Sequence, residues 1–140
     1  MSGNQPANGR HVVHVEAVEV VNVPGAVEIA IGQTRYSGLY FQDNEVARAW
    51  AVESFQRGVG SGRQKGFTVN LYQDGSITVM SFEGEKTVKG DPTESRFEGR
   101  WTFSGGTGRF ASIQGGGTYE GESFGAMAYS NVSGAVSKLG

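Results

Sequence analysis

The 140-residue chain contains no cysteine, which excludes disulfide frameworks, thiolate zinc sites and cysteine nucleophiles. It has only two histidines, His11 and His14. On a strand, residues three apart point to opposite faces, so these two do not chelate one metal ion simply, and we expect both at the surface or at an edge. Neither a G-x-S-x-G nor a G-x-x-x-x-G-K-[ST] motif occurs. We therefore expect no metal and no cofactor.

The chain also lacks a large excess of charge of either sign and lacks long apolar runs. The 12 basic and 14 acidic residues give a net charge of −2, which predicts no nucleic-acid partner and no attraction to an anionic membrane. No apolar run reaches the roughly 18 residues of a spanning helix. Residues 1–10 are polar and lack the pattern of a secretory signal, so we expect a flexible tail there. Together with the missing cysteine, this predicts a cytoplasmic protein.

Glycine, by contrast, is abundant. The chain has 23 glycines, 18 of them from residue 58 onward, which is about twice the usual share of roughly 7%. Glycine within strands marks bulges, tight bends and close approach of backbones, and a small barrel needs many such corners. Residues 11–140 are therefore predicted to form a single all-β domain, an antiparallel β-barrel.

Alternation of apolar and polar residues predicts the strands and their buried faces. Residues 67–72 alternate Phe67, Val69 and Leu71 with polar side chains, and a turn at 73–75 leads into a returning strand, which is the pattern of a hairpin. Residues 97–103 alternate in the same way. The predicted core comprises Val13, Val15, Phe67, Val69, Leu71, Val79, Phe97, Trp101, Phe103, Phe110 and Ile113.

Residues 43–57 are the one candidate for a short helix. Asp43 is a suitable N-cap, and Val46 and Trp50, like Ala51 and Phe55, recur at helical spacing. Gly58 stands where a helix would end. A broken strand is the alternative interpretation of this segment.

The segment GRWTFSGGTGRFASIQGGGTYEG, residues 99–121, resembles the allene oxide cyclase barrel superfamily, which includes dirigent-type proteins. The preceding hairpin, residues 71–84, is similar in placement and character. The resemblance implies an eight-stranded antiparallel barrel with an apolar interior, and association into a homo-oligomer through outer faces. The members of this superfamily include enzymes that cyclise or isomerise a reactive lipid or polyketide chain, and non-catalytic templates. Because the shared corner at 105–110 is structural, no catalytic residue carries over by position.

Polar side chains within the predicted strands are the candidates for a site. We select Glu83, Arg100 and Tyr129 as candidate catalytic residues, because a carboxylate desolvated in an apolar barrel titrates closer to neutral pH and can act as an acid or base. A tyrosine hydroxyl could hold a carbonyl or epoxide oxygen. The candidate ligand-binding residues are Tyr36, Tyr40, Trp50, Met127 and Asn131. The alternative is that Glu98 and Arg100 form a solvated pair on the outside, that Glu83 also lies outside, and that the aromatic residues are core.

These observations lead to two functional hypotheses. In the first, the barrel encloses an apolar small-molecule ligand and guides its cofactor-free cyclisation or isomerisation, mainly through conformation and exclusion of water. In the second, the protein is a non-catalytic binding or scaffold protein, either a carrier or a subunit of an assembly. A fold by itself does not decide between them, so whether the protein is an enzyme stays open at this point.

Overall fold

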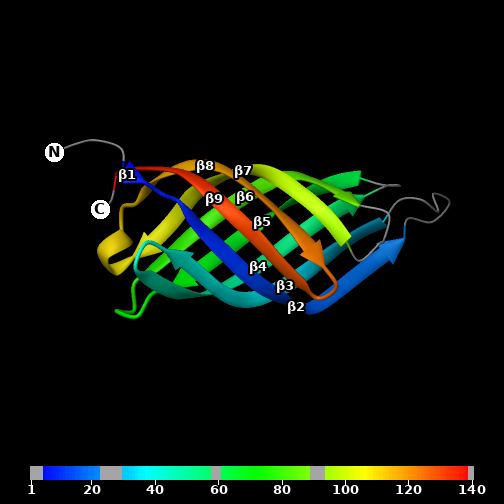
Figure 1. The fold of residues 1–140 in the computed structure, drawn as a ribbon, viewed down its shortest axis with the longest axis horizontal. Coiled ribbons are helices and arrows are strands. Elements are labelled where there is room, and N and C mark those ends of the chain that lie inside the picture. The colour runs from blue at the N-terminus through cyan, green and yellow to red at the C-terminus, as the bar shows by residue number, and fades with distance from the viewer. Residues whose placement is uncertain (1–4, 23–29, 58–60, 89–93, 139–140) are drawn as a thin grey trace.

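The computed structural model describes residues 5–22, 30–57, 61–88 and 94–138, which form a closed antiparallel β-barrel (Figure 1). The elements, in chain order, are β1 (Gln5–Pro6), β2 (Gly9–Asn22), β3 (Ala30–Gln42), β4 (Glu45–Arg57), β5 (Ser61–Leu71), β6 (Ile77–Val88), β7 (Glu94–Thr107), the 3₁₀ turn η1 (Gly108–Phe110), β8 (Gln114–Phe124) and β9 (Met127–Lys138).

The last strand closes the barrel. From β2 to β9 each strand pairs antiparallel with the next, and β9 also pairs with β2 and with β1. Since β1 and β2 lie along the same edge of β9, the described residues build a wall of eight strands. The prediction of an all-β, eight-stranded antiparallel barrel is confirmed. None of the helices in the described part of the chain is long and apolar enough to cross a membrane.

The helix predicted near 43–57 is wrong, because this segment is strand β4. Its residues pair with β3 along one edge and with β5 along the other. Ala47, Ala49 and Glu53 are buried, whereas Trp50 and Val52 are exposed, which is the period of two that a strand requires. Apolar residues on both faces of the strand imitated helical spacing, and pairing on both edges overrode the local preference.

The face of β5 that lines the interior is the opposite of the predicted one. Thr68, Asn70 and Tyr72 are buried, whereas Phe67 is 55% exposed. Val69, Leu71 and Val79 lie half-buried on the outer face. The prediction is confirmed for four other core residues, because Phe97, Trp101, Phe110 and Ile113 are buried. Val13 and Phe103 are partly buried and pack against this core, and Val15 is half-buried.

The prediction of a flexible tail does not hold for residues 5–10. Gln5 and Pro6 pair with Val136 and Ala135 of β9, and Ala7 is almost fully buried. Residues 5–10 therefore belong to the barrel wall, while residues 1–4 lie outside the described residues.

One end of the barrel is filled by side chains. The rings of Tyr72 and Phe110 lie 4.9 Å apart, and the guanidinium of Arg109 stacks over both of them. Arg109 also forms ion pairs with Glu45, the first residue of β4, and with Asp74 in the turn between β5 and β6. Access to the interior is therefore to be sought at the opposite end, where β2, β4 and β6 finish (Figure 1).

Candidate functional site

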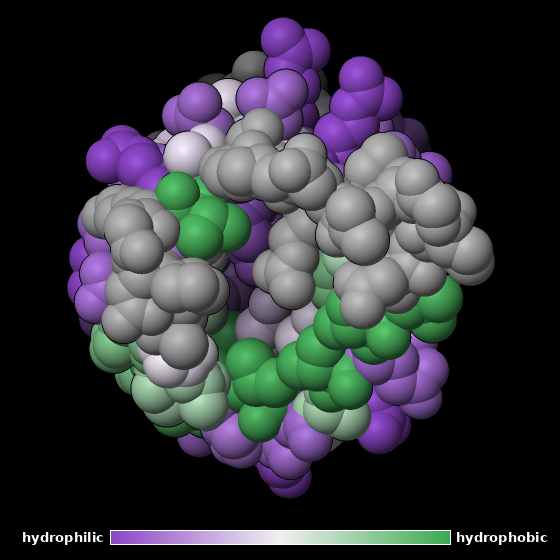
Figure 2. All heavy atoms as spheres, turned by 90° about the vertical axis from the view of Figure 1, so that its right-hand side faces the viewer, coloured by the Kyte–Doolittle hydropathy of each residue, from purple (hydrophilic) through white to green (hydrophobic). Residues whose placement is uncertain are grey.

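The interior of the barrel holds a cavity of about 90 Å³. A second space of about 250 Å³ lies toward the end where β2, β4 and β6 finish, and its lining shares Tyr36, Glu53 and Ala128 with the inner cavity. Figure 2 looks at this end, where the surface is hollowed. We call the second space the mouth and the two together the lumen.

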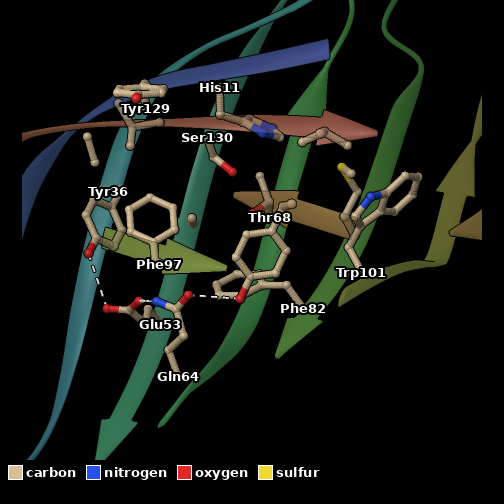
Figure 3. A pocket seen from close by; sticks show the side chains of 16 residues that line it. His11, Tyr36, Glu53, Gln64, Thr68, Phe82, Phe97, Trp101, Tyr129 and Ser130 are labelled. Atoms are coloured by element: carbon tan, nitrogen blue, oxygen red, sulfur yellow. Dashed lines mark hydrogen bonds between the residues drawn. The ribbon is translucent and has the colours of Figure 1, made fainter. Parts of the chain in front are cut away.

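The inner cavity has apolar walls interrupted by a few polar side chains (Figure 3). The apolar lining includes Val13, Met80, Phe82, Phe97, Trp101 and Val132. The polar lining is His11, Tyr36, Glu53, Gln64, Thr68, Tyr119, Tyr129 and Ser130. At about 90 Å³ the inner cavity is smaller than an engineered apolar cavity of about 150 Å³ that binds benzene. A ligand too large for the inner cavity would therefore have to extend into the mouth.

Glu53 is the centre of a polar cluster at the boundary between the inner cavity and the mouth. Its side chain is only 4% exposed and lies 3.5 Å from Nζ of Lys86. It accepts hydrogen bonds from the Tyr36 hydroxyl, at 3.2 Å, and from the Gln64 amide. Tyr119 extends the cluster by donating to Oε1 of Gln64 at 2.9 Å. A buried carboxylate with an ion-pair partner and hydrogen bonds avoids much of the cost of an isolated charge.

The two tyrosine hydroxyls of this cluster stay protonated. Burial, followed by the charge of Glu53, raises the pKa of Tyr36 above its ordinary value. The pKa of Tyr119 is raised by burial and then by the charges of Glu53 and Glu83. Both residues therefore act as neutral hydrogen-bonding groups near neutral pH.

A second polar cluster lies deeper in the barrel around His11. This residue is buried, against the expectation of a surface or edge position. His14 is exposed, and its Nε2 lies 2.7 Å from Oε1 of Glu16. Nε2 of His11 is 2.9 Å from Oδ1 of Asn70, and the ring stacks on Tyr40 with centroids 4.1 Å apart. Burial lowers the pKa of His11 to about 4, so the ring is neutral at pH 7.

Two of the three candidate catalytic residues lie together but outside the barrel. Glu83 and Arg100 are partners in the pairing of β6 with β7, and both are exposed. They line a groove of about 600 Å³ on the outer face, together with Lys65. Glu98, the residue that the alternative interpretation pairs with Arg100, is exposed on the same strand as well.

The polar groups of the third, Tyr129, and of Asn131 contact residues on the neighbouring strands β8 and β2. The Tyr129 hydroxyl donates to Glu122 at 3.3 Å, and its ring lies under the guanidinium of Arg10. The Asn131 amide donates to Glu120 at 3.1 Å and its oxygen accepts from Arg10 at 2.8 Å. Tyr129 also belongs to the lining of the inner cavity, but its hydroxyl is bonded to Glu122.

The other candidate ligand-binding residues divide between the lumen and other places. Tyr36 lines both spaces of the lumen, and Met127 lines the mouth while remaining 41% exposed. Tyr40 is buried and stacks on His11. Trp50 is 37% exposed on the outer face, under the guanidinium of Arg48.

Sequence reasoning missed the residues that organise the lumen, chiefly Glu53, Gln64 and Asn70. A signal for Glu53 existed, because it continues the alternate series of small residues Ala47, Ala49 and Ala51. Small side chains on one face of a strand leave room in a barrel, so the charged residue that follows them is a candidate for the lumen. Assigning the segment to a helix concealed this signal.

Within the described ranges, no group of three or more acidic or histidine side chains is placed to hold a metal ion. The fold and the cavity define a closed antiparallel β-barrel with a partly polar lumen. Neither a family model, nor a curated protein, nor a solved structure matches the chain. The site must therefore be interpreted from its own geometry.

Proposed function

We propose that the barrel binds a small, largely apolar organic molecule in its lumen, with the mouth as the route of entry. The observation that carries this proposal is the cavity itself, whose apolar walls carry a few oriented polar groups around Glu53. Apolar walls with a small number of placed hydrogen-bonding groups are typical of ligand pockets. A barrel filled only for stability would not need a buried carboxylate at this place.

A second candidate function is cofactor-free isomerisation or cyclisation of the bound molecule. The resemblance of residues 99–121 to the allene oxide cyclase barrel superfamily favours it, as does the carboxylate of Glu53 in the lining of the cavity. In this reaction the walls would hold a reactive conformation and exclude water, and Glu53 would accept a proton from one position of the substrate and return it to another, so that the carboxylate is regenerated. Glu53→Gln would then lower turnover much more than ligand affinity.

The non-catalytic scaffold remains a distinct proposal, and the outer face of the barrel favours it. Leu39, Phe41, Val46, Val52 and Phe67 are each between 38% and 55% exposed on β3, β4 and β5. An exposed apolar surface of this kind is typical of protein association sites, here between copies of the chain. Sedimentation velocity over a range of concentrations measures this directly, and a monomer at all of them would contradict it.

Lumen binding is tested by native mass spectrometry of the protein purified from its own host, before and after denaturation. We expect a non-covalent adduct of one small molecule that is lost on denaturation. Ala51→Phe places a large ring into the inner cavity and should abolish the adduct. Ser54→Phe adds the same ring to an exposed position of the same strand and should retain it. An adduct that persists in Ala51→Phe would place the ligand outside the lumen.

A further inference from the structure

The directions of the hydrogen bonds around Glu53 are fixed by its charge. A carboxylate only accepts hydrogen bonds, so Gln64 must turn its amide nitrogen toward Glu53. The Gln64 oxygen then faces Tyr119, whose hydroxyl must donate at 2.9 Å. The Tyr36 hydroxyl likewise donates to Glu53. Both tyrosine protons are therefore used within the protein, and only lone pairs of the two hydroxyl oxygens remain for a ligand.

The direction of the bond at His11 is fixed by a methionine. The Asn70 amide nitrogen lies 3.3 Å from the sulfur of Met80 and 3.1 Å from the hydroxyl of Thr78. A thioether sulfur has no proton to donate, so the Asn70 oxygen must be the atom that faces His11. Nε2 of His11 therefore carries the proton, and the neutral ring keeps a lone pair on Nδ1.

Three of the lining groups with a fixed direction thus accept hydrogen bonds, whereas the second N–H of the Gln64 amide is a donor. The three acceptors are the hydroxyl oxygens of Tyr36 and Tyr119 and Nδ1 of His11, on three residues that line the inner cavity. The hydroxyls of Thr68 and Ser130 rotate and are able to donate or accept, so they do not discriminate. The charge of Glu53 is balanced by Lys86, and the lining therefore favours a neutral ligand.

We propose that the lumen selects neutral molecules that carry hydrogen-bond donors, such as alcohols, over carbonyl compounds of the same shape. This rests on the proposed binding function and adds the chemical class of the ligand. It reverses the expectation that a tyrosine hydroxyl holds a carbonyl or epoxide oxygen. A carbonyl oxygen next to these fixed acceptors would leave them and itself unpaired, which costs more than the loss of an ordinary hydrogen bond.

Cyclopentanol and cyclopentanone are suitable probes, because they have the same ring and differ in the hydrogen-bonding group. Their dissociation constants are measured by NMR titration, following the indole N–H of Trp101, a residue in the cavity lining. We expect the alcohol to bind at least about threefold more tightly, the factor that one net hydrogen bond gives. Equal affinities, or tighter ketone binding, would overturn the donor rule while leaving lumen binding intact. If neither probe binds, the proposed function fails with it.

A pair of double variants sharpens the test. Thr68→Val with Ser130→Ala removes two rotatable hydroxyls of the lining that are able to donate to a ketone. The preference for cyclopentanol should therefore increase. Thr118→Val with Ser133→Ala makes the same changes at exposed, paired positions of β8 and β9 and should leave the preference unchanged. A preference that stays the same or decreases in the first variant would contradict the assignment.

Discussion

Two phenylalanines on opposite faces of the barrel wall test which face of each strand lines the lumen. Phe97 is 9% exposed inside the barrel, whereas Phe67 is 55% exposed outside it. The sequence alone places both in the core. Phe97→Ala and Phe67→Ala are the same chemical change, so the difference between their effects on stability reports burial alone.

The size of that difference follows from the exposed fractions. Full burial of a phenylalanine side chain contributes about 1.5–3 kcal/mol, and truncation inside a core adds the cost of the cavity, for a total of about 3–5 kcal/mol. We therefore expect about 3–4 kcal/mol for Phe97→Ala. Phe67 buries a little under half of its surface and water fills the space that it leaves, so Phe67→Ala should cost about 1 kcal/mol.

Urea unfolding followed by far-ultraviolet circular dichroism measures both values. In a thermal scan, about 3–5 °C per kcal/mol for a domain of this size predicts a gap of roughly 10 °C. A loss for Phe67→Ala as large as that for Phe97→Ala, and independent of protein concentration, would refute the face assignment of β5. A loss that grows with concentration would instead indicate that a second copy covers Phe67.

Three further predictions concern other parts of the barrel. Burial lowers the pKa of His11 from 6.5 to about 4. The stability that its neutral form provides is therefore complete above pH 6.5 and is lost as the pH falls toward 4. The pH dependence of the unfolding free energy across this range should disappear in His11→Gln and persist in His14→Gln. Gly99→Ala would place a Cβ 2.2 Å from a backbone oxygen of the adjacent strand and should cost about 1–3 kcal/mol in urea unfolding, whereas Gly105→Ala, with nothing within 4 Å, should stay within about 0.5 kcal/mol. Lys86→Met removes the cation 3.5 Å from a buried carboxylate and should lower the unfolding free energy by about 2–4 kcal/mol; an unchanged value would show that the carboxylate does not depend on it.

The barrel itself was predictable from the sequence because its signals are local. The turn at Asp74-Gly75 and the alternation on either side predict the hairpin of β5 and β6, which the structure has at this place. The interior aromatic residues Phe97 and Trp101 were identified because the positions between them are polar or glycine. Period and turn chemistry were enough for these strands, and no information from distant residues was needed.

The site was not predictable in the same way, because the arrangement of its polar side chains depends on partners in other strands. In β5, Phe67 and its alternate neighbours are the more apolar set, yet they face outward. Asn70 is tolerated inside because its amide group contacts Thr78 and Met80 on the adjacent strand β6 and His11 on β2. No local pattern encodes such a network, since each polar residue alone would be costly to bury.

Closure of the wall by β9 has a consequence for folding. The side chains of Arg10 and Asn131 form a hydrogen bond of 2.8 Å across 121 positions of the chain, as part of the seam between the first long strand and the last. During synthesis this seam cannot form until β9 has left the ribosome, so β2 and β8 keep unpaired edges until then. Such a high contact order predicts slow folding, and open edges of this kind invite pairing with other chains. Chaperones that shield strand edges would therefore be expected to matter most for this protein in the interval before its last strand emerges.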